Sequence, residues 1–219
     1  RAAMARMPLP VPRSPTAPSG RAAASSSSAR RQRRVLAWVP VPKARPGSTT
    51  MVSASRERVP AIQRGTTRLC LRALEELAAA RPLGAVADLG TGTGILAIAA
   101  LRLGAPSVLA IDTDPDAVAA AQVNAARNGC AGLTVRLAEP QDVEGRFPVV
   151  VANLLTHAHL ALAEHYARLV APGGHLVLGG MLDGEDVRVA EALSGLGFGT
   201  RWSVPLDGWA SLLLVAPAR

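Results

Sequence analysis

The chain has 219 residues, of which 49% are hydrophobic and 18% are charged, and its formal net charge is +8 at pH 7. This length fits one ordinary domain with an appendage, and no apolar run reaches the roughly eighteen residues that a membrane helix needs, so we expect no membrane span. Two cysteines, Cys70 and Cys130, are too few for a disulfide framework and match no metal-ligand spacing. We therefore expect reduced thiols and no bound metal.

The first 58 residues differ in composition from the rest of the chain. They are rich in Arg, Ala, Ser and Pro, and residues 1–56 contain ten Arg, one Lys and no acidic residue. The remaining residues carry a net charge of −3, because eleven of the positive charges lie in this segment. Such a composition predicts a disordered basic tail over residues 1–58, followed by a folded domain over residues 59–219.

Three interpretations of this tail stay open. An Arg- and Ser-rich segment without acids resembles an organelle transit peptide, which would place the protein in an organelle. The same composition also suits an arm that contacts nucleic acid. The third interpretation is that the tail has no function. Direct nucleic-acid binding by the mildly acidic folded domain is not expected.

The folded domain is predicted to begin with a helix that Thr66 or Thr67 caps and that ends near Pro82. After it, short apolar runs alternate with helical patterns. The expected strands are residues 85–89, 107–111, 133–137, 148–153, 174–180, 200–205 and 210–216, and the expected helices are residues 94–103, 115–127, 157–170 and 184–196. This order predicts an α/β fold: a three-layer, doubly wound, mostly parallel seven-stranded sheet, Rossmann-like, with a late antiparallel strand.

A glycine-rich loop follows the first expected strand, where Gly90, Gly92 and Gly94 form a G-x-G-x-G pattern. Glycine permits backbone angles that a Cβ forbids and lets a ligand approach the main chain, and the helix that follows points its free N–H groups at the loop. Asp88 lies just before the loop. Asp112 ends the second strand, where a carboxylate can accept hydrogen bonds from two ribose hydroxyls. The combination predicts an S-adenosylmethionine site; a dinucleotide site is less favoured, because its usual pattern is G-x-G-x-x-G.

Several stretches of this domain match the motifs of one enzyme family. Residues 66–71 read T-T-R-L-C-L, residues 88–101 read D-L-G-T-G-T-G-I-L-A-I-A-A-L, residues 110–115 read A-I-D-T-D-P, residues 150–155 read V-V-A-N-L-L, and residues 172–174 read P-G-G. Together they resemble the PrmA-type ribosomal protein methyltransferases, which act on large-subunit ribosomal protein eleven. The resemblance runs from about Gly65 to the C-terminus.

The resemblance implies a class I methyltransferase fold with S-adenosylmethionine as methyl donor. It also implies methylation of amino groups, on lysine side chains or the N-terminus, of a ribosomal protein. Carried over by position, the family's cofactor contacts are Thr67, Gly90, Asp112 and Asn153. Our own interpretation of the sequence adds Asp88 and Gly92 to this cofactor site. No catalytic residue is assigned, and we expect a cytoplasmic monomer.

Two features depart from the family. Its members carry F-G-T-G-x-H directly before T-T, where this chain reads P-A-I-Q-R-G over residues 60–65. They also have an N-terminal α+β domain for substrate recognition, which residues 1–58 are not expected to form. Two alternatives therefore stay open. One is a methyltransferase of the same fold that acts on another protein or a small molecule; the other is a truncated, inactive remnant.

The histidines of the domain are predicted to be structural rather than catalytic. His157 and His159 follow the A-N-L-L stretch and are expected on a helix surface, and His165 and His175 are also expected on the surface. Trp202 is expected to pack at a sheet edge, an environment that aromatic residues favour.

Overall fold

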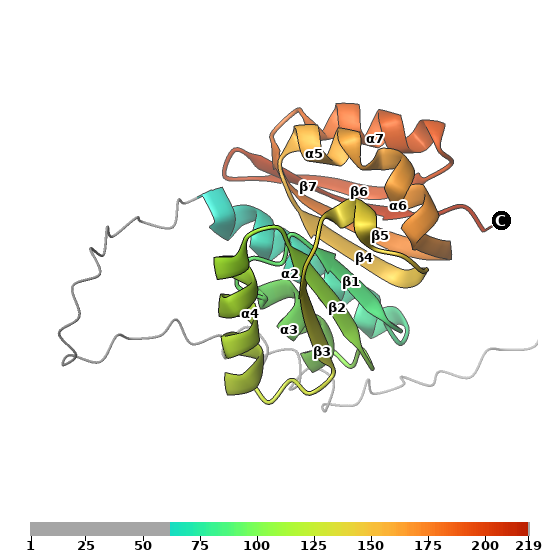
Figure 1. Cartoon of the computed structure of the whole chain (residues 1–219). Helices are drawn as coiled ribbons and strands as arrows, with labels where there is room; N and C mark the ends of the chain where they lie inside the picture. Colours follow the sequence, from blue (N-terminus) through green and yellow to red (C-terminus); the bar gives the residue numbers. More distant parts are fainter. Residues whose placement is uncertain (1–61, 219) are drawn as a thin grey trace, which may run out of the picture.

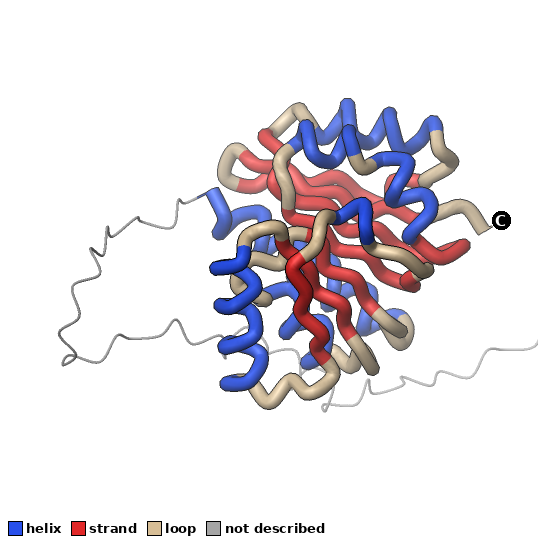
Figure 2. Tube along the Cα trace, viewed as in Figure 1, coloured by secondary structure: helices blue, strands red, loops and turns tan. Residues whose placement is uncertain are grey.

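The computed structural model describes residues 62–218, so the predictions for the tail (residues 1–58) and for a domain start at residue 59 lie outside the described residues. The described residues form one seven-stranded sheet with helices on both faces, as Figure 1 and Figure 2 show. The strands are β1 (Val86–Leu89), β2 (Val108–Asp112), β3 (Leu133–Leu137), β4 (Phe147–Asn153), β5 (Val170–Leu182), β6 (Gly199–Leu206) and β7 (Trp209–Val215). The helices are α2 (Ile62–Ala80), α3 (Ile95–Arg102), α4 (Pro115–Arg127), α5 (Thr156–Ala161), α6 (Ala163–Leu169) and α7 (Asp186–Gly195), with a short 3-10 helix η1 (Pro140–Asp142).

The strand order is β3-β2-β1-β4-β5-β7-β6, which confirms the predicted fold class. Strands β1 to β5 run parallel, and β7 inserts between β5 and β6 in the antiparallel sense. β1 pairs with β2 on one side and with β4 on the other, so the strand order reverses at β1. Ligands of open α/β sheets bind at such a switch point, beyond the carboxyl ends of the strands.

A tight turn joins β6 to β7. Asp207 has φ +55° and Gly208 has φ +80°, the left-handed pair of angles that a type I′ hairpin turn requires. Asp tolerates this region better than most side chains, and Gly has no Cβ to clash. The turn lies at the same edge of the sheet as the carboxyl ends of the parallel strands, because Leu182 at the end of β5 pairs with Trp209 at the start of β7.

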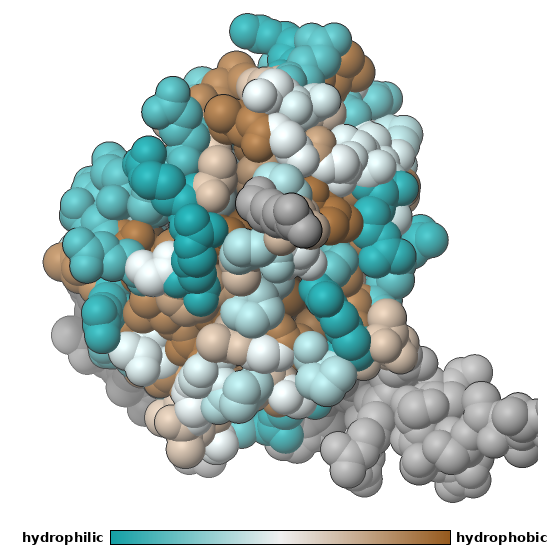
Figure 3. Space-filling view, turned by 90° about the vertical axis from the view of Figure 1, so that its right-hand side faces the viewer, coloured by the Kyte–Doolittle hydropathy of each residue, from teal (hydrophilic) through white to brown (hydrophobic). Residues whose placement is uncertain are grey.

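Apolar side chains fill the space on both faces of the sheet. On one face, α2 and α3 contribute buried residues such as Leu74 and Leu96; on the other, α6 and α7 contribute Tyr166 and Leu193. On the side of the molecule that Figure 3 shows, hydrophobic atoms lie in separate places between hydrophilic side chains. None of the helices within residues 62–218 combines the length and the hydropathy of a membrane-spanning segment.

Two helix predictions are wrong. The first helix starts at Ile62, so Thr66 and Thr67 lie inside it and do not cap it; Thr66 is buried there. The helix expected over residues 157–170 is two helices, because Leu162 between them has φ −93° and ψ 1° and ends the first one.

Candidate functional site

The glycine-rich loop connects β1 to α3 at the switch point of the sheet. Gly90 and Gly92 have φ angles of +74° and +55°, in the left-handed region that favours glycine. A Cβ on Gly90 would meet Leu154 Cδ2 at 2.4 Å, whereas no neighbouring atom of the described residues lies within 4 Å of a Cβ on Gly92. Gly90 therefore lets the segment after β4 pack against the loop, and Gly92 leaves open space above the main chain.

Asp88 is buried in β1 and ties the loop to α3. Its Oδ2 accepts hydrogen bonds from Thr91 Oγ1 at 2.7 Å and from the Ala97 backbone N–H at 3.1 Å. Its Oδ1 is also buried and has no hydrogen-bond partner among the described residues. Burial raises the pKa of this carboxyl to about 6, although the hydrogen bonds from Thr91 and Ala97 act in the opposite direction.

Asp112 ends β2 beside the loop. Its Oδ2 accepts a hydrogen bond from the Gly92 backbone N–H at 2.8 Å, and its Oδ1 accepts one from the Asp114 backbone N–H at 3.1 Å. Each carboxylate oxygen has more than one lone pair, so both can accept a further hydrogen bond. The structure thus fixes the orientation of a partly exposed carboxylate next to Gly92.

Asn153 ends β4 on the other side of β1. Leu89, the last residue of β1, pairs with Ile111 of β2 and with Ala152 of β4, so Asp112 and Asn153 follow on either side of it. Asn153 Nδ2 donates to Thr67 Oγ1 of α2 at 3.3 Å. All six residues predicted for the cofactor site therefore lie around one edge of the sheet, and their contacts with a cofactor stay a prediction.

Two consecutive glycines of β5, Gly179 and Gly180, lie at the site although the sequence did not predict them there. A Cβ on Gly179 would come within 2.9 Å of Asn153 Oδ1 and 2.7 Å of Cys70 Sγ. Gly180 has φ +87°, and a Cβ there would lie 2.3 Å from the Leu154 backbone oxygen. These glycines allow β5 to pass close to the segment that carries Asn153. The only sequence signal was the Gly-Gly pair inside an apolar strand.

A buried histidine, His159, supports Gly179 and the segment after β4. His159 Nε2 lies 2.8 Å from the Gly179 carbonyl oxygen, and its Nδ1 lies 3.0 Å from the Tyr166 hydroxyl. The Gly179 carbonyl also accepts the Leu154 backbone N–H at 3.0 Å. Burial lowers the pKa of His159 to about 4, so the ring is neutral at pH 7 and fits one donor and one acceptor contact.

The surface position predicted for three of the four histidines is therefore wrong. His159, His165 and His175 are all buried, while His157 is exposed as expected. His159 contacts the Gly179 carbonyl, and His175 contacts Arg81 and Arg201, partners that periodicity does not reveal. His165 Nε2 is buried without a hydrogen-bond partner among the described residues. Burial also lowers the pKa of His165.

An open cavity of about 340 Å³ adjoins the segment after β4. Its walls come from that segment, the end of β5, the start of β7 and the region between β5 and α7. The lining residues are Leu155, Thr156, His157, Leu160, Gly180, Leu182, Glu185, Arg188 and Trp209. Thr156 Oγ1 donates to Glu185, which also accepts the Leu182 backbone N–H at 3.3 Å. These two contacts join the walls of the cavity.

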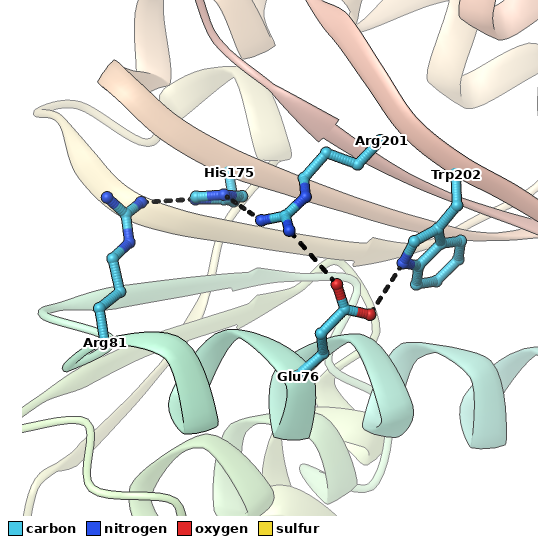
Figure 4. Close-up of polar contacts among 5 residues, drawn as sticks. All are labelled: Glu76, Arg81, His175, Arg201 and Trp202. Carbon is cyan, nitrogen blue, oxygen red and sulfur yellow. Dashed lines mark hydrogen bonds and ion pairs between the residues drawn. The ribbon is translucent and has the colours of Figure 1, made fainter. Parts of the chain in front are cut away.

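A separate polar cluster lies at the opposite edge of the sheet (Figure 4). Glu76 of α2 accepts the Trp202 indole N–H at 3.1 Å and pairs with Arg201 at 3.6 Å. His175 of β5 lies between the guanidinium groups of Arg81, at 2.5 Å, and Arg201, at 3.5 Å. Burial, with Arg81 and Arg201 nearby, lowers the pKa of His175 to about 4. This cluster joins α2 to β5 and β6, and Trp202 packs against the core there, as predicted.

Within residues 62–218, no group of three or more His, Cys, Asp or Glu side chains is arranged to hold a metal ion. Cys70 and Cys130 are both free thiols. Burial raises the pKa of Cys70 to about 12, with Asp88 acting in the same direction, so this thiol stays protonated beneath the site.

Comparison with known proteins links the chain to one family. The model of the family described as "Ribosomal protein L11 methyltransferase (PrmA)" matches residues 63–216. A relative named ribosomal protein L11 methyltransferase, from Geobacter metallireducens, is 43% identical over 153 residues, which make up 69% of this chain and 49% of the relative. The chain spans about half the length of the curated relatives it matches.

Two solved structures show the same fold. The ribosomal protein L11 methylase of Lactobacillus delbrueckii subsp. bulgaricus matches with a TM-score of 0.65 and 34% identity, over 69% of this chain and 79% of that chain. An RNA methyltransferase from Salinibacter ruber, solved in complex with S-adenosyl-L-homocysteine, matches with a TM-score of 0.56 and 25% identity, over 69% of this chain and 92% of that chain.

Proposed function

This chain belongs to the ribosomal protein L11 methyltransferase (PrmA) family, and on that premise we propose that it transfers a methyl group from S-adenosylmethionine to an amino group of a ribosomal protein. The observation that carries the proposal is the convergence of Gly92, Asp112 and Asn153 at one edge of the sheet. Large-subunit ribosomal protein eleven is the first substrate to test, because relatives are named for it.

The described residues fit S-adenosylmethionine in chemistry and in space. Among residues 62–218, no atom outside Gly92 and its two chain neighbours lies within 4 Å of a Cβ position on Gly92, so a ligand can lie against the main chain there. Asp112 is a carboxylate held in place with spare acceptor capacity, as ribose hydroxyls require. The buried Asp88 Oδ1 has no partner among residues 62–218, which suits a site that a polar ligand group completes.

The roles of the chain's own residues follow from these contacts. When bound, S-adenosylmethionine supplies a methyl group activated by the positive charge on its sulfur. Asn153 cannot take up a proton at neutral pH, so its amide acts through hydrogen bonds. In addition to its predicted cofactor contact, we assign its carbonyl oxygen the part of orienting the acceptor amine. Thr67 fixes the amide by accepting a hydrogen bond from Nδ2. Leu154 packs against Gly90, so the segment after β4 and the loop after β1 lie in close contact.

A ribosomal substrate also bears on location and assembly. We propose that the protein acts in the cytoplasm as a monomer, with an organelle as the alternative if residues 1–58 act as a transit peptide.

Burial of Asp88, His159 and Cys70 around Asn153 suits a site in which water is excluded from the reacting groups.

Methyl transfer tests the proposal directly. The purified chain is incubated with S-adenosylmethionine and ribosomal protein eleven, and the products are analysed by mass spectrometry. We expect methylated lysine or N-terminal amine, and a rate reduced about 100-fold by Asn153→Ala even when S-adenosylmethionine is saturating. Cofactor binding without transfer to any ribosomal protein would contradict the proposal.

A further inference from the structure

We propose that the cavity beside Asn153 is a docking site for an apolar side chain of the substrate protein, next to the amine that is methylated. The occupant is a polypeptide segment that carries a hydrophobic residue beside a lysine. This inference rests on the proposed function, because it assigns a substrate-binding role to the surface next to that site.

The position of the cavity is the first step of the argument. Leu155 lies two residues after Asn153, and Gly180 contacts the backbone of Leu154. A side chain that fills the cavity is therefore within a few residues of an amine placed at Asn153. The hydrogen bonds from Thr156 and from the Leu182 backbone to Glu185 keep the walls together.

The apolar rim is the second step. Leu155 is 54% exposed and Leu182 is 48% exposed, although both are large hydrophobic residues. Leu160 and Trp209 line the same cavity and are partly exposed. Exposed apolar side chains grouped around a concavity are typical of interaction sites, since docking removes them from water.

The charge of the rim is the third step, and it selects the partner. Asp183 and Asp207 are exposed on two turns that meet, because the Asp183 backbone N–H donates to the Gly208 carbonyl at 3.1 Å. Asp183 follows the lining residue Leu182, and Asp207 lies two residues before the lining residue Trp209, so both turns adjoin the cavity. Glu185 and Arg188 line the cavity itself. An excess of carboxylates around apolar walls favours a segment that combines a hydrophobic side chain with a lysine, and disfavours an acidic peptide or a nucleic-acid backbone.

Kinetics with the substrate protein form the first test. Leu155→Ser and Leu182→Ser remove apolar surface from the rim, and Leu155 occupies the N-cap of α5, a position that serine favours. We expect each variant to raise the KM for ribosomal protein eleven about tenfold, with an unchanged Kd for S-adenosylmethionine. The matched control is Val123→Ser on α4, because Val123 is also 48% exposed. Equal KM values for the rim variants and the control would overturn the inference.

Charge neutralisation adds a second arm. Asp183→Asn combined with Asp207→Asn keeps the side-chain shape, and asparagine tolerates the positive φ of residue 207. We expect a KM increase of about threefold at low salt that disappears at high salt. A KM that does not depend on these carboxylates at low salt would count against a lysine-bearing partner.

A binding arm separates failure of this inference from failure of the proposed function. The methyl resonances of leucine are followed by NMR while a capped Leu-Lys-Leu tripeptide is titrated into the full chain with S-adenosylhomocysteine. We expect shifts at Leu155, Leu160 and Leu182 that the matched Leu-Glu-Leu peptide does not produce, even if no methyl transfer occurs. No shift at these residues, equal shifts with both peptides, or a dimer of this chain that Leu155→Ser dissociates would each overturn the inference.

Discussion

The two edges of the sheet use polar residues in opposite ways, although α2 reaches both. At the amino edge, Glu76, His175 and Arg201 bond to one another and to nearby residues, so their polar groups are used within the fold (Figure 4). At the carboxyl edge, Asp112 is held by two backbone hydrogen bonds and Asn153 by one side-chain hydrogen bond, and both keep further hydrogen-bonding capacity.

This difference separates residues that hold the fold from residues that are available to a ligand. Both edges carry a buried, neutral histidine, so burial of a titratable group does not by itself mark the site. What marks the carboxyl edge is open space over Gly92 together with fixed polar groups that are not saturated. Changes at the amino edge should therefore affect stability alone, and changes at the carboxyl edge should also affect ligand binding.

The largest expected effect comes from Gly180→Ala. The left-handed angle at residue 180 is unfavourable for alanine, and the new Cβ would overlap the Leu154 backbone, which cannot move without displacing β4. We expect the free energy of unfolding to fall by about 4 kcal/mol, measured by urea denaturation. Gly184→Ala is the matched control, because Gly184 has φ +86° with nothing within 4 Å; it should cost about 1–2 kcal/mol. Equal losses would show that packing against Leu154 is unimportant.

The next largest effect is the loss of stability at acidic pH that arises from His159. The pKa of His159 is about 4 in the folded state, below the ordinary value of 6.5, so the unfolded chain binds this proton first as pH falls. Stability is therefore present above pH 6.5 and is lost between pH 6.5 and 4, with a slope of up to about 1.4 kcal/mol per pH unit for one proton. His159→Gln keeps a donor for Gly179 and should remove this part of the slope, measured by denaturation across that range. An unchanged slope would contradict the assignment.

Gly92→Ala sharpens the comparison at the carboxyl edge. A Cβ at this position meets no protein atom within 4 Å, so the fold should lose only about 1 kcal/mol from the positive φ. The affinity for S-adenosylmethionine should fall more than tenfold, because the Cβ occupies the space that we assign to the ligand, as calorimetric titration can measure. Gly129→Ala is the control, with φ +63° and an open surrounding in the turn after α4; it should leave that affinity unchanged.

The smallest effect is expected at the amino edge. Glu76→Ala removes the ion pair with Arg201 and the hydrogen bond from Trp202, both at a partly exposed position. We expect a loss of about 1 kcal/mol in unfolding free energy and no change in cofactor affinity. Glu164→Ala, at an exposed position of α6, serves as the control and should leave stability nearly unchanged. A cofactor affinity that falls with Glu76→Ala would break the separation between the two edges.

The fold and the core of the site follow from local features of the sequence. Buried strands such as residues 86–89 appear as apolar runs. Asp88 and the glycine-rich loop are adjacent in the sequence, and Asp112 ends the next apolar run, so these residues mark the switch point. The start of the first helix was misplaced, since Thr66 has the side chain of a cap but is buried inside the helix. Intrinsic preference was overridden there by tertiary packing.

The residues that support the site could not be predicted, because their roles depend on partners far away in the chain. His159 contacts the carbonyl of Gly179, 20 residues further along the chain, and Gly180 owes its importance to Leu154, which follows a different strand. No period in the sequence brings these groups together. The cavity beside Asn153 is likewise formed by residues of two strands, two helices and the segments next to them, so only the folded chain reveals it.

Calorimetric titration of S-adenosylmethionine into the purified chain tests the central claim most directly, namely that these residues form a donor site. We expect one saturable binding event with the wild-type chain. Asp112→Ala, which removes the carboxylate that we assign to two ribose hydroxyls, should weaken it about 30- to 100-fold, whereas Asp142→Ala in η1 should leave it unchanged. The absence of binding by the wild-type chain, or equal binding by Asp112→Ala, would contradict the claim.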